Sequence, residues 1–173
     1  MKKIFLLIFF ILFSVELNAK IKPPFENIIT LNEPKDYGDI TFENFEGKSL
    51  SLKDYKSNIY ILNFWATWCA PCKKEMPSLD KLQIKEGINI FAINIEGKNQ
   101  NKTRKFFKDL NIKNLSIFFD LEFKLSKLLN LRGIPTTVIL NKDRREIARI
   151  IGDIDFNDSN FINWLSIISK KNN

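Results

Sequence analysis

The two cysteines of this 173-residue chain lie three positions apart, in the stretch WCAPC. The chain has no cysteine besides Cys69 and Cys72, and it has no histidine. Two thiols at this spacing could form a structural disulfide, hold a metal ion, or act as a redox pair that opens and closes. The residues around them help to choose among these three kinds of chemistry.

A purely structural role is disfavoured by the short loop that a Cys69–Cys72 disulfide would close. The stabilisation from a disulfide grows with loop length, because a longer loop removes more freedom from the unfolded chain. A closed zinc site is disfavoured because it needs four nitrogen or sulfur ligands, so we predict no metal site. Two thiols could still bind a two-coordinate Cu(I) ion or a metal shared between two chains, and a copper carrier stays open as an alternative.

The neighbouring residues favour the redox pair. The apolar run IYILNFW predicts a buried strand that ends shortly before the cysteines, so Cys69 is expected at the start of a helix. The unpaired backbone N–H groups and the positive end of the helix dipole favour a thiolate at that position. Pro71 suits the first helical turn, where its missing N–H would have no partner. Cys72 lies one turn later and could attack a mixed disulfide formed at Cys69.

The rest of the sequence predicts the elements that position the pair. Apolar and polar residues alternate on both sides of EGK, which indicates a β-hairpin. Strands that alternate with helices require a largely parallel sheet, and a late hairpin adds antiparallel strands, so the fold class is α/β. The expected elements are hairpins at 40–52 and 136–152, strands at 59–65, 88–95 and 115–120, and helices at 69–85, 103–112, 121–131 and 157–171. Pro77 falls inside the first helix, and Asn157 or Asp158 is expected to cap the last one.

Two stretches of the chain resemble one known family. NFWATWCAPCKKEMPSLDKL resembles the active-site segment of thioredoxin-fold proteins, and most of all that of the exported TlpA/ResA-like thiol–disulfide oxidoreductases. RGIPTTVILNKDRREIARIIG resembles the part of that family in which a cis-proline precedes a strand and a hairpin. The resemblance covers roughly residues 38–170. It implies a thioredoxin fold, with a central mixed sheet flanked by helices and an N-terminal β-hairpin extension.

For the cysteines, the resemblance implies that Cys69 is the exposed attacking thiolate and Cys72 the buried resolving thiol, with their redox-active disulfide in place of a cofactor. Thioredoxin usually has a buried aspartate two residues before the first tryptophan of the motif, whereas this chain has Asn63, which cannot titrate. Glu75 matches a carboxylate of the ResA-like branch and is expected to move protons at the pair. A glutamate early in a helix is also favoured by the helix dipole alone, and this simpler interpretation stays open.

The resemblance further implies a substrate-docking surface. Trp68 would pack beside the cysteines, and with Ala70 and Pro71 it would shape that surface. Pro135 would be cis and would lie against the disulfide. The backbone of Ile134 would then pair with an extended segment of the substrate.

The N-terminus has the pattern of an export signal. Two lysines precede a 12-residue apolar run, which is shorter than the ~18–20 residues that span a bilayer. Residues 1–19 are therefore predicted to be a signal peptide, with an uncleaved membrane anchor as the alternative. Residues 20–38 are expected to be an extended lead-in or linker, and residues 39–170 a thioredoxin-like domain. Export would place the cysteines in a periplasmic or other extracytoplasmic space, where disulfides persist.

Together these features predict an enzyme that reduces the disulfides of protein substrates through Cys69 and Cys72. The resemblance implies a membrane thiol reductase as electron donor and, as one substrate, apocytochrome c in cytochrome c maturation. A thiol oxidant or a disulfide isomerase of the same fold is the alternative, since the motif does not fix the reduction potential. A peroxidase on the related peroxiredoxin scaffold would need a Thr and a Pro before one cysteine, where this chain has WATWCAPC. The net charge of +7 is not gathered into a nucleic-acid motif, so no nucleic-acid partner is expected.

Overall fold

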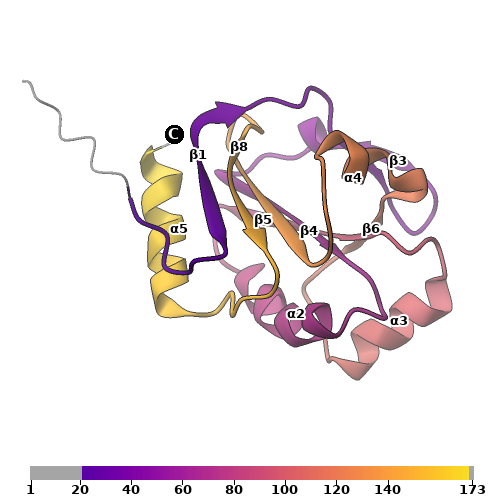
Figure 1. Ribbon diagram of the computed structural model, residues 1–173. Coiled ribbons are helices and arrows are strands. Elements are labelled where there is room, and N and C mark those ends of the chain that lie inside the picture. The colour runs from indigo at the N-terminus through magenta and orange to yellow at the C-terminus, as the bar shows by residue number, and fades with distance from the viewer. Residues whose placement is uncertain (1–20, 172–173) are drawn as a thin grey trace, which may run out of the picture.

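An eight-stranded mixed sheet runs through the centre of the computed structural model, which describes residues 21–171 (Figure 1). The strand order is β1-β8-β7-β4-β5-β6-β2-β3. The strands are β1 (Ile28–Lys35), β2 (Thr41–Glu43), β3 (Ser49–Ser51), β4 (Ile59–Trp65), β5 (Ile88–Asn94), β6 (Ile117–Phe119), β7 (Thr136–Asn141) and β8 (Glu146–Ile151). β4, β5 and β6 are parallel, whereas β7 runs antiparallel to both β4 and β8. The expected α/β class with a central mixed sheet is confirmed.

The helices lie close to the positions that the sequence predicts. They are α2 (Ala70–Leu82), α3 (Gln100–Asp109), α4 (Lys124–Leu128) and α5 (Ser159–Lys171), with 3-10 turns η1 (Leu52–Asp54) and η2 (Leu121–Phe123). Pro77 lies inside α2. The carboxylate of Asp158 accepts hydrogen bonds from the backbone N–H groups of Asn160 and Phe161, at 2.8 and 3.0 Å, and so caps α5.

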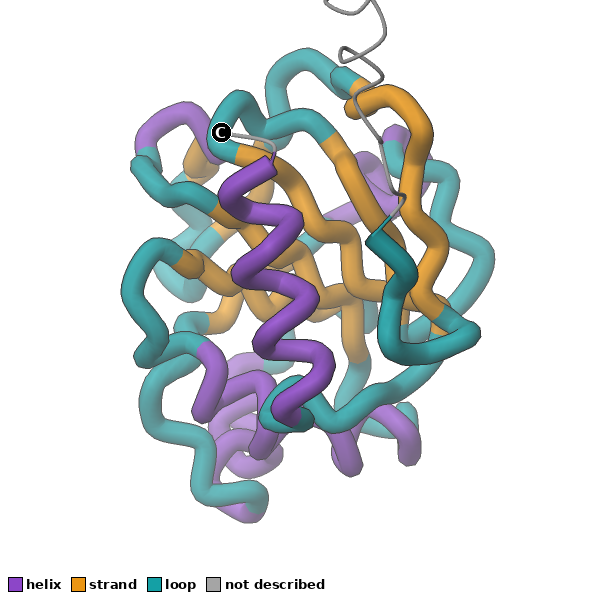
Figure 2. The backbone as a smooth tube through the Cα atoms, turned by 90° about the vertical axis from the view of Figure 1, so that its left-hand side faces the viewer, coloured by secondary structure: helices purple, strands orange, loops and turns teal. Residues whose placement is uncertain are grey.

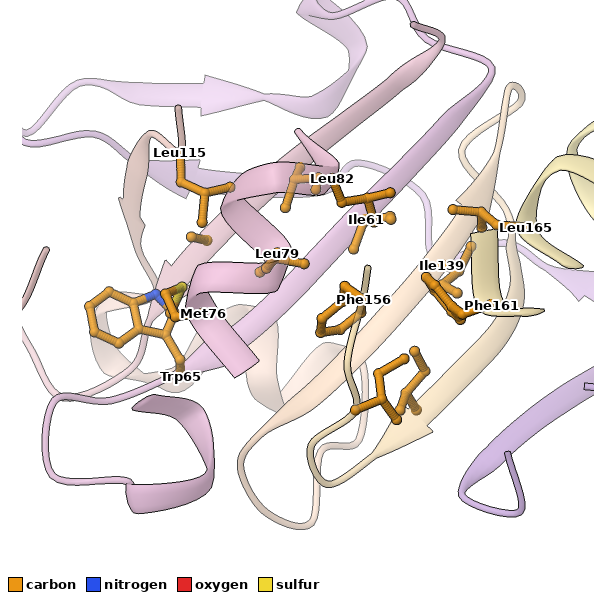
Figure 3. Close-up of a cluster of buried hydrophobic side chains, with 14 of the residues drawn as sticks. Ile61, Trp65, Met76, Leu79, Leu82, Leu115, Ile139, Phe156, Phe161 and Leu165 are labelled. Atoms are coloured by element: carbon orange, nitrogen blue, oxygen red, sulfur yellow. The ribbon is translucent and has the colours of Figure 1, made fainter. Parts of the chain in front are cut away.

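Each face of the sheet has its own apolar core, because successive side chains of a strand point to opposite faces. On β4, Ile61 and Trp65 face the core to which α2, α3 and α5 contribute (Figure 3). Leu62 and Phe64 face the second core, which the β2–β3 hairpin and α4 help to close. Figure 2 shows α5 lying in front of the strands. All seven residues of β4 are buried, so the strand that leads to the cysteines is held from both sides.

One edge of the sheet differs from the expectation. Residues 28–35 were expected within a lead-in ahead of the domain, but they form β1, which pairs antiparallel with β8 (Figure 1). Only Ile28 of this strand is buried, so the segment lacks the apolar alternation by which a half-buried strand is recognised. The sheet thus begins before residue 39. The β2–β3 hairpin lies at the other edge, where β2 pairs with β6, as an N-terminal extension.

The predicted signal peptide or membrane anchor, residues 1–19, lies outside the described residues. Between residues 21 and 171, no helix is long and apolar enough to cross a membrane.

Asp80 joins α2 to the loop that leads into β6. Its side chain is nearly buried, and its carboxylate accepts hydrogen bonds from the backbone N–H groups of Lys113, Asn114 and Leu115 at 3.1, 2.7 and 3.0 Å. The side-chain amide of Asn114 donates a further bond at 2.9 Å. One carboxylate therefore accepts three consecutive backbone N–H groups and one side-chain amide of this loop.

We expect Asp80→Ala to lower the free energy of unfolding by about 2 to 3 kcal/mol, because several donors lose their acceptor in a largely buried site. Urea unfolding of the oxidised protein measures this change. The matched control is Asp109→Ala, since Asp109 forms an exposed ion pair with Lys105 on α3. The control should change the free energy by less than about 0.5 kcal/mol. Equal effects of the two substitutions would contradict this role of Asp80.

Candidate active site

The cysteines lie where β4 ends and α2 begins, and they are joined in a disulfide. Cys69 is the N-cap residue of α2, and its sulfur accepts a hydrogen bond from the backbone N–H of Cys72 at 3.2 Å. The expected start of the helix is confirmed. The sulfur of Cys69 thus lies at the helix end whose unpaired N–H groups favour a negative charge.

Exposure varies strongly along the motif. Trp68 is 64% exposed, whereas Cys69 is 4% exposed and Cys72 is fully buried. Ala70 and Pro71 are exposed. Cys69 is the more accessible of the two cysteines, but it is far less exposed than the resemblance implied, since its sulfur is turned toward Cys72 and the end of α2. The outward surface of the motif is formed by Trp68, Ala70 and Pro71.

The second matching stretch reaches the same end of the sheet. β7 pairs antiparallel with β4, and Thr136 lies opposite Phe64. Pro135 directly precedes Thr136, so it lies beside the end of β4 from which the cysteines follow. The Ile134–Pro135 peptide bond is cis, as the resemblance implied. Pro135 is buried and Ile134 half-buried.

Glu75 is buried together with Asn63. The amide nitrogen of Asn63 donates hydrogen bonds to Glu75 Oε1 at 2.8 Å and to the hydroxyl oxygen of Thr137 at 2.9 Å. All three side chains are almost completely buried, with exposed fractions of 0, 1 and 0%. The group therefore joins β4, α2 and β7 beside the redox pair.

Burial makes the carboxyl group of Glu75 an unusually weak acid. It raises the pKa of Glu75 from its ordinary 4.5 to about 8, because a carboxylate loses most of its hydration there. The hydrogen bond from Asn63 and the backbone N–H of Ile154 oppose this rise, and the charge of Asp153 adds to it. Glu75 is thus mostly protonated at neutral pH and can exchange its proton near pH 8. A group with this pKa can act as acid and as base at physiological pH.

The sequence singles out Asn63 and Glu75 but not Thr137, the second acceptor of the Asn63 amide. Thr137 belongs to the GIPTT stretch, and only the β4–β7 register places it opposite Asn63. No local pattern carries that register, so a local reading of the sequence misses the contact. In the part of the chain that the structure describes, no cluster of three or more His, Cys, Asp and Glu side chains could hold a metal ion.

Comparisons with known proteins agree with this geometry. Residues 35–148 match the model of the AhpC/TSA family. The thiol-disulfide oxidoreductase ResA of Bacillus cereus strain ZK/E33L is 31% identical over 122 residues, which cover 69% of each chain. The chain belongs to the AhpC/TSA family, among the ResA-like thiol–disulfide oxidoreductases. Its Cys69–Cys72 pair is the CxxC pair of such an enzyme.

Solved structures share the fold of this ResA-like oxidoreductase. A DsbF homologue from Corynebacterium diphtheriae is 27% identical, with a TM-score of 0.66 over 84% of this chain and 96% of that one. StoA from Bacillus subtilis is 25% identical, with a TM-score of 0.60 over 76% of this chain and 99% of that one. The thioredoxin fold and the redox interpretation of the two cysteines are confirmed.

The pKa of Glu75 predicts how stability depends on pH. Above its ordinary pKa the carboxyl group ionises in the unfolded chain, while in the folded protein it stays protonated until about pH 8. Folding therefore binds a proton in this window, and Glu75 lowers the free energy of unfolding by up to about 1.4 kcal/mol per pH unit as pH rises from 5 to 8.

We expect Glu75→Gln to remove this slope, which urea unfolding of the oxidised protein at pH 5, 6.5 and 8 would measure. Glu86→Gln, at an exposed position, is the control and should keep the pH dependence of the wild type. Parallel curves for the wild type and Glu75→Gln would show that the pKa of Glu75 is not raised.

Proposed function

We propose that this oxidoreductase works as a reductant of protein disulfides outside the cytoplasm. The observation that carries the proposal is the position of Cys69 at the N-terminus of α2, with Cys72 one turn behind it and fully buried. A thiolate at Cys69 is stabilised by the helix end, whereas the thiol of Cys72 is shielded from outside disulfides. The two thiols therefore differ in the way that an attacking and a resolving cysteine must.

The cycle transfers two electrons to the substrate. The Cys69 thiolate attacks a substrate disulfide, which breaks as a mixed disulfide forms between Cys69 and one substrate sulfur, and the other substrate sulfur leaves as a thiol after taking a proton. Cys72 then loses its proton and attacks the sulfur of Cys69. The second substrate thiol is released, and the Cys69–Cys72 disulfide is formed.

Glu75 is the group that we assign to proton transfer at Cys72. It lies three residues after Cys72 on the same helix, so both side chains lie on one face of α2. Its pKa of about 8 is near that of an ordinary thiol, which suits proton exchange between the two. Asn63 holds the carboxyl group through one hydrogen bond and cannot itself titrate.

Substrate docking is assigned to the exposed motif and the cis-proline segment. Trp68, Ala70 and Pro71 form the outward surface next to the pair. Pro135 directly precedes β7 and lies beside the end of β4. The backbone of Ile134 would pair with an extended stretch of the substrate. The residues on which a substrate would lie thus come from two parts of the chain more than sixty residues apart.

The likeness to ResA supports disulfide-bearing proteins as substrates, and we propose apocytochrome c awaiting haem attachment as one of them. Reduction outside the cytoplasm consumes electrons, so a membrane thiol reductase would have to return the Cys69–Cys72 disulfide to the dithiol. The signal-like pattern of residues 1–19 supports export, with or without an N-terminal membrane anchor. Cytochrome c maturation is the process that this substrate and location imply.

A trapping experiment tests the order of the two cysteines. Cys72→Ser leaves Cys69 able to attack but removes the thiol that releases the substrate, so we expect a covalent adduct in the exporting cell. Non-reducing electrophoresis and mass spectrometry would identify the partner. Cys69→Ser is the control and should trap at least about tenfold less, because the remaining thiol is buried. Adducts of equal yield through either cysteine, or none with Cys72→Ser, would defeat the proposed roles.

A further inference from the structure

The turn between β4 and α2 determines where the reactive groups lie. It consists of residues 66–68, and the backbone N–H of Cys69 donates a hydrogen bond to the carbonyl of Ala66 at 3.2 Å. Trp68 and Cys69 follow directly from this turn. Any side chain that fixes the turn therefore also fixes the exposed tryptophan and the N-cap sulfur.

Glu96, which follows β5 after one intervening residue, binds the turn with both of its carboxylate oxygens. Oε2 accepts the backbone N–H of Thr67, and Oε1 accepts the hydroxyl of Thr67 at 2.9 Å. The ammonium group of Lys102 on α3 lies 2.7 Å from Oε1. The Glu96 side chain is only 10% exposed. Burial alone would raise the pKa of Glu96, but the hydrogen bonds from Lys102 and Thr67 hold it below its ordinary value.

The segment that carries Glu96 is itself held in place. The backbone N–H of Glu96 donates to the side-chain oxygen of Asn94 at 2.8 Å, and the N–H of Ile95 donates to the carbonyl of Trp65 at 3.0 Å. The ring of Trp65 stacks on Phe106 of α3, with the ring centres 4.6 Å apart. Glu96 therefore reaches the turn from a segment that is anchored to β4 and lies against α3.

We propose that Glu96 is a positioning residue for the redox pair: its two hydrogen bonds to Thr67 hold Trp68 and Cys69 in the geometry that the thiolate needs. Without them, Thr67 loses the acceptor of its N–H and of its hydroxyl, and the turn can leave this geometry. The sulfur of Cys69 would then spend less time at the end of α2, where the N–H groups stabilise its negative charge. The inference rests on the proposed attack by Cys69, and it assigns no substrate contact to Glu96.

Two substitutions at Glu96 separate position from charge. In Glu96→Gln, the amide oxygen can accept the N–H of Thr67 and the amide nitrogen can donate to its hydroxyl, so both contacts are kept while the charge and the ion pair with Lys102 are lost. In Glu96→Ala, both contacts and the charge are lost. A carboxylate that acted only through its charge would raise the pKa of a nearby thiol, so its removal would lower that pKa in both variants.

The measurement is the pH profile of iodoacetamide alkylation of Cys69 in the reduced protein, together with kcat/KM for reduction of insulin. We expect Glu96→Ala to raise the apparent pKa of the Cys69 thiol and to lower kcat/KM about tenfold, as loss of alignment does. Glu96→Gln should stay within about twofold of the wild type in kcat/KM. Lys105→Met, which removes an exposed ion pair one turn further along α3, is the control and should change neither quantity.

The proposal is overturned if Glu96→Ala behaves as the wild type, or if Glu96→Gln loses as much activity as Glu96→Ala. A thiol pKa that falls in both variants would also overturn it, since charge would then be the cause. If Glu96→Ala does not fold, Thr67→Val takes its place, because Val removes the hydroxyl that donates to Glu96. Thr67→Ser keeps this donor and serves as the conservative variant. Alkylation needs no protein substrate, so failure of the proposed reductase activity would appear separately, as a wild type that leaves insulin oxidised.

Discussion

The fixed position of the N-terminus of α2 is the constraint on which the site depends. β4 is buried on both faces, so its path is fixed, and the chain must leave the sheet at Trp65 and begin the helix at Cys69. The sulfur of Cys69 takes the place of a capping oxygen by accepting the N–H of Cys72. The same helix then presents Cys72 and Glu75 at intervals of three residues, on the face that turns inward. One helix start thus sets together the three groups to which we assign attack, resolution and proton transfer.

Burial of Glu75 is the part of this arrangement that works against stability. An acid with a pKa of about 8 in the folded protein and an ordinary pKa in the unfolded chain makes the fold less stable as pH rises. Its hydrogen bond from Asn63 moderates this effect without adding a second titrating group to the interior. Such a local conflict between burial and charge is what a functional site is expected to show. This cost to folding stability at alkaline pH is consistent with the proton-transfer role that we propose for Glu75.

Local patterns in the sequence predict the parts of the site that are close in the chain. The apolar run of β4, the cysteines and the proline between them predict the helix start, and the family resemblance of GIPTT implies the cis-proline segment at Pro135. Contacts that depend on strand order are not predicted, since Thr137 meets Asn63 and Glu96 meets Thr67 only once β7 and β5 flank β4. β1 is missed for a related reason, because an exposed edge strand is held by its pairing with β8 and buries only Ile28. Short-range periodicity contains neither kind of information.

The direction of electron flow is the central claim, and the reduction potential of the Cys69–Cys72 pair tests it most directly. Equilibration with defined ratios of reduced and oxidised glutathione, read out by alkylation and mass spectrometry, measures this potential. A reductant of protein disulfides is expected to have a value more negative than about −200 mV, so that its dithiol donates electrons to most exposed disulfides. A value near about −120 mV, typical of a strong periplasmic oxidant, would contradict the account.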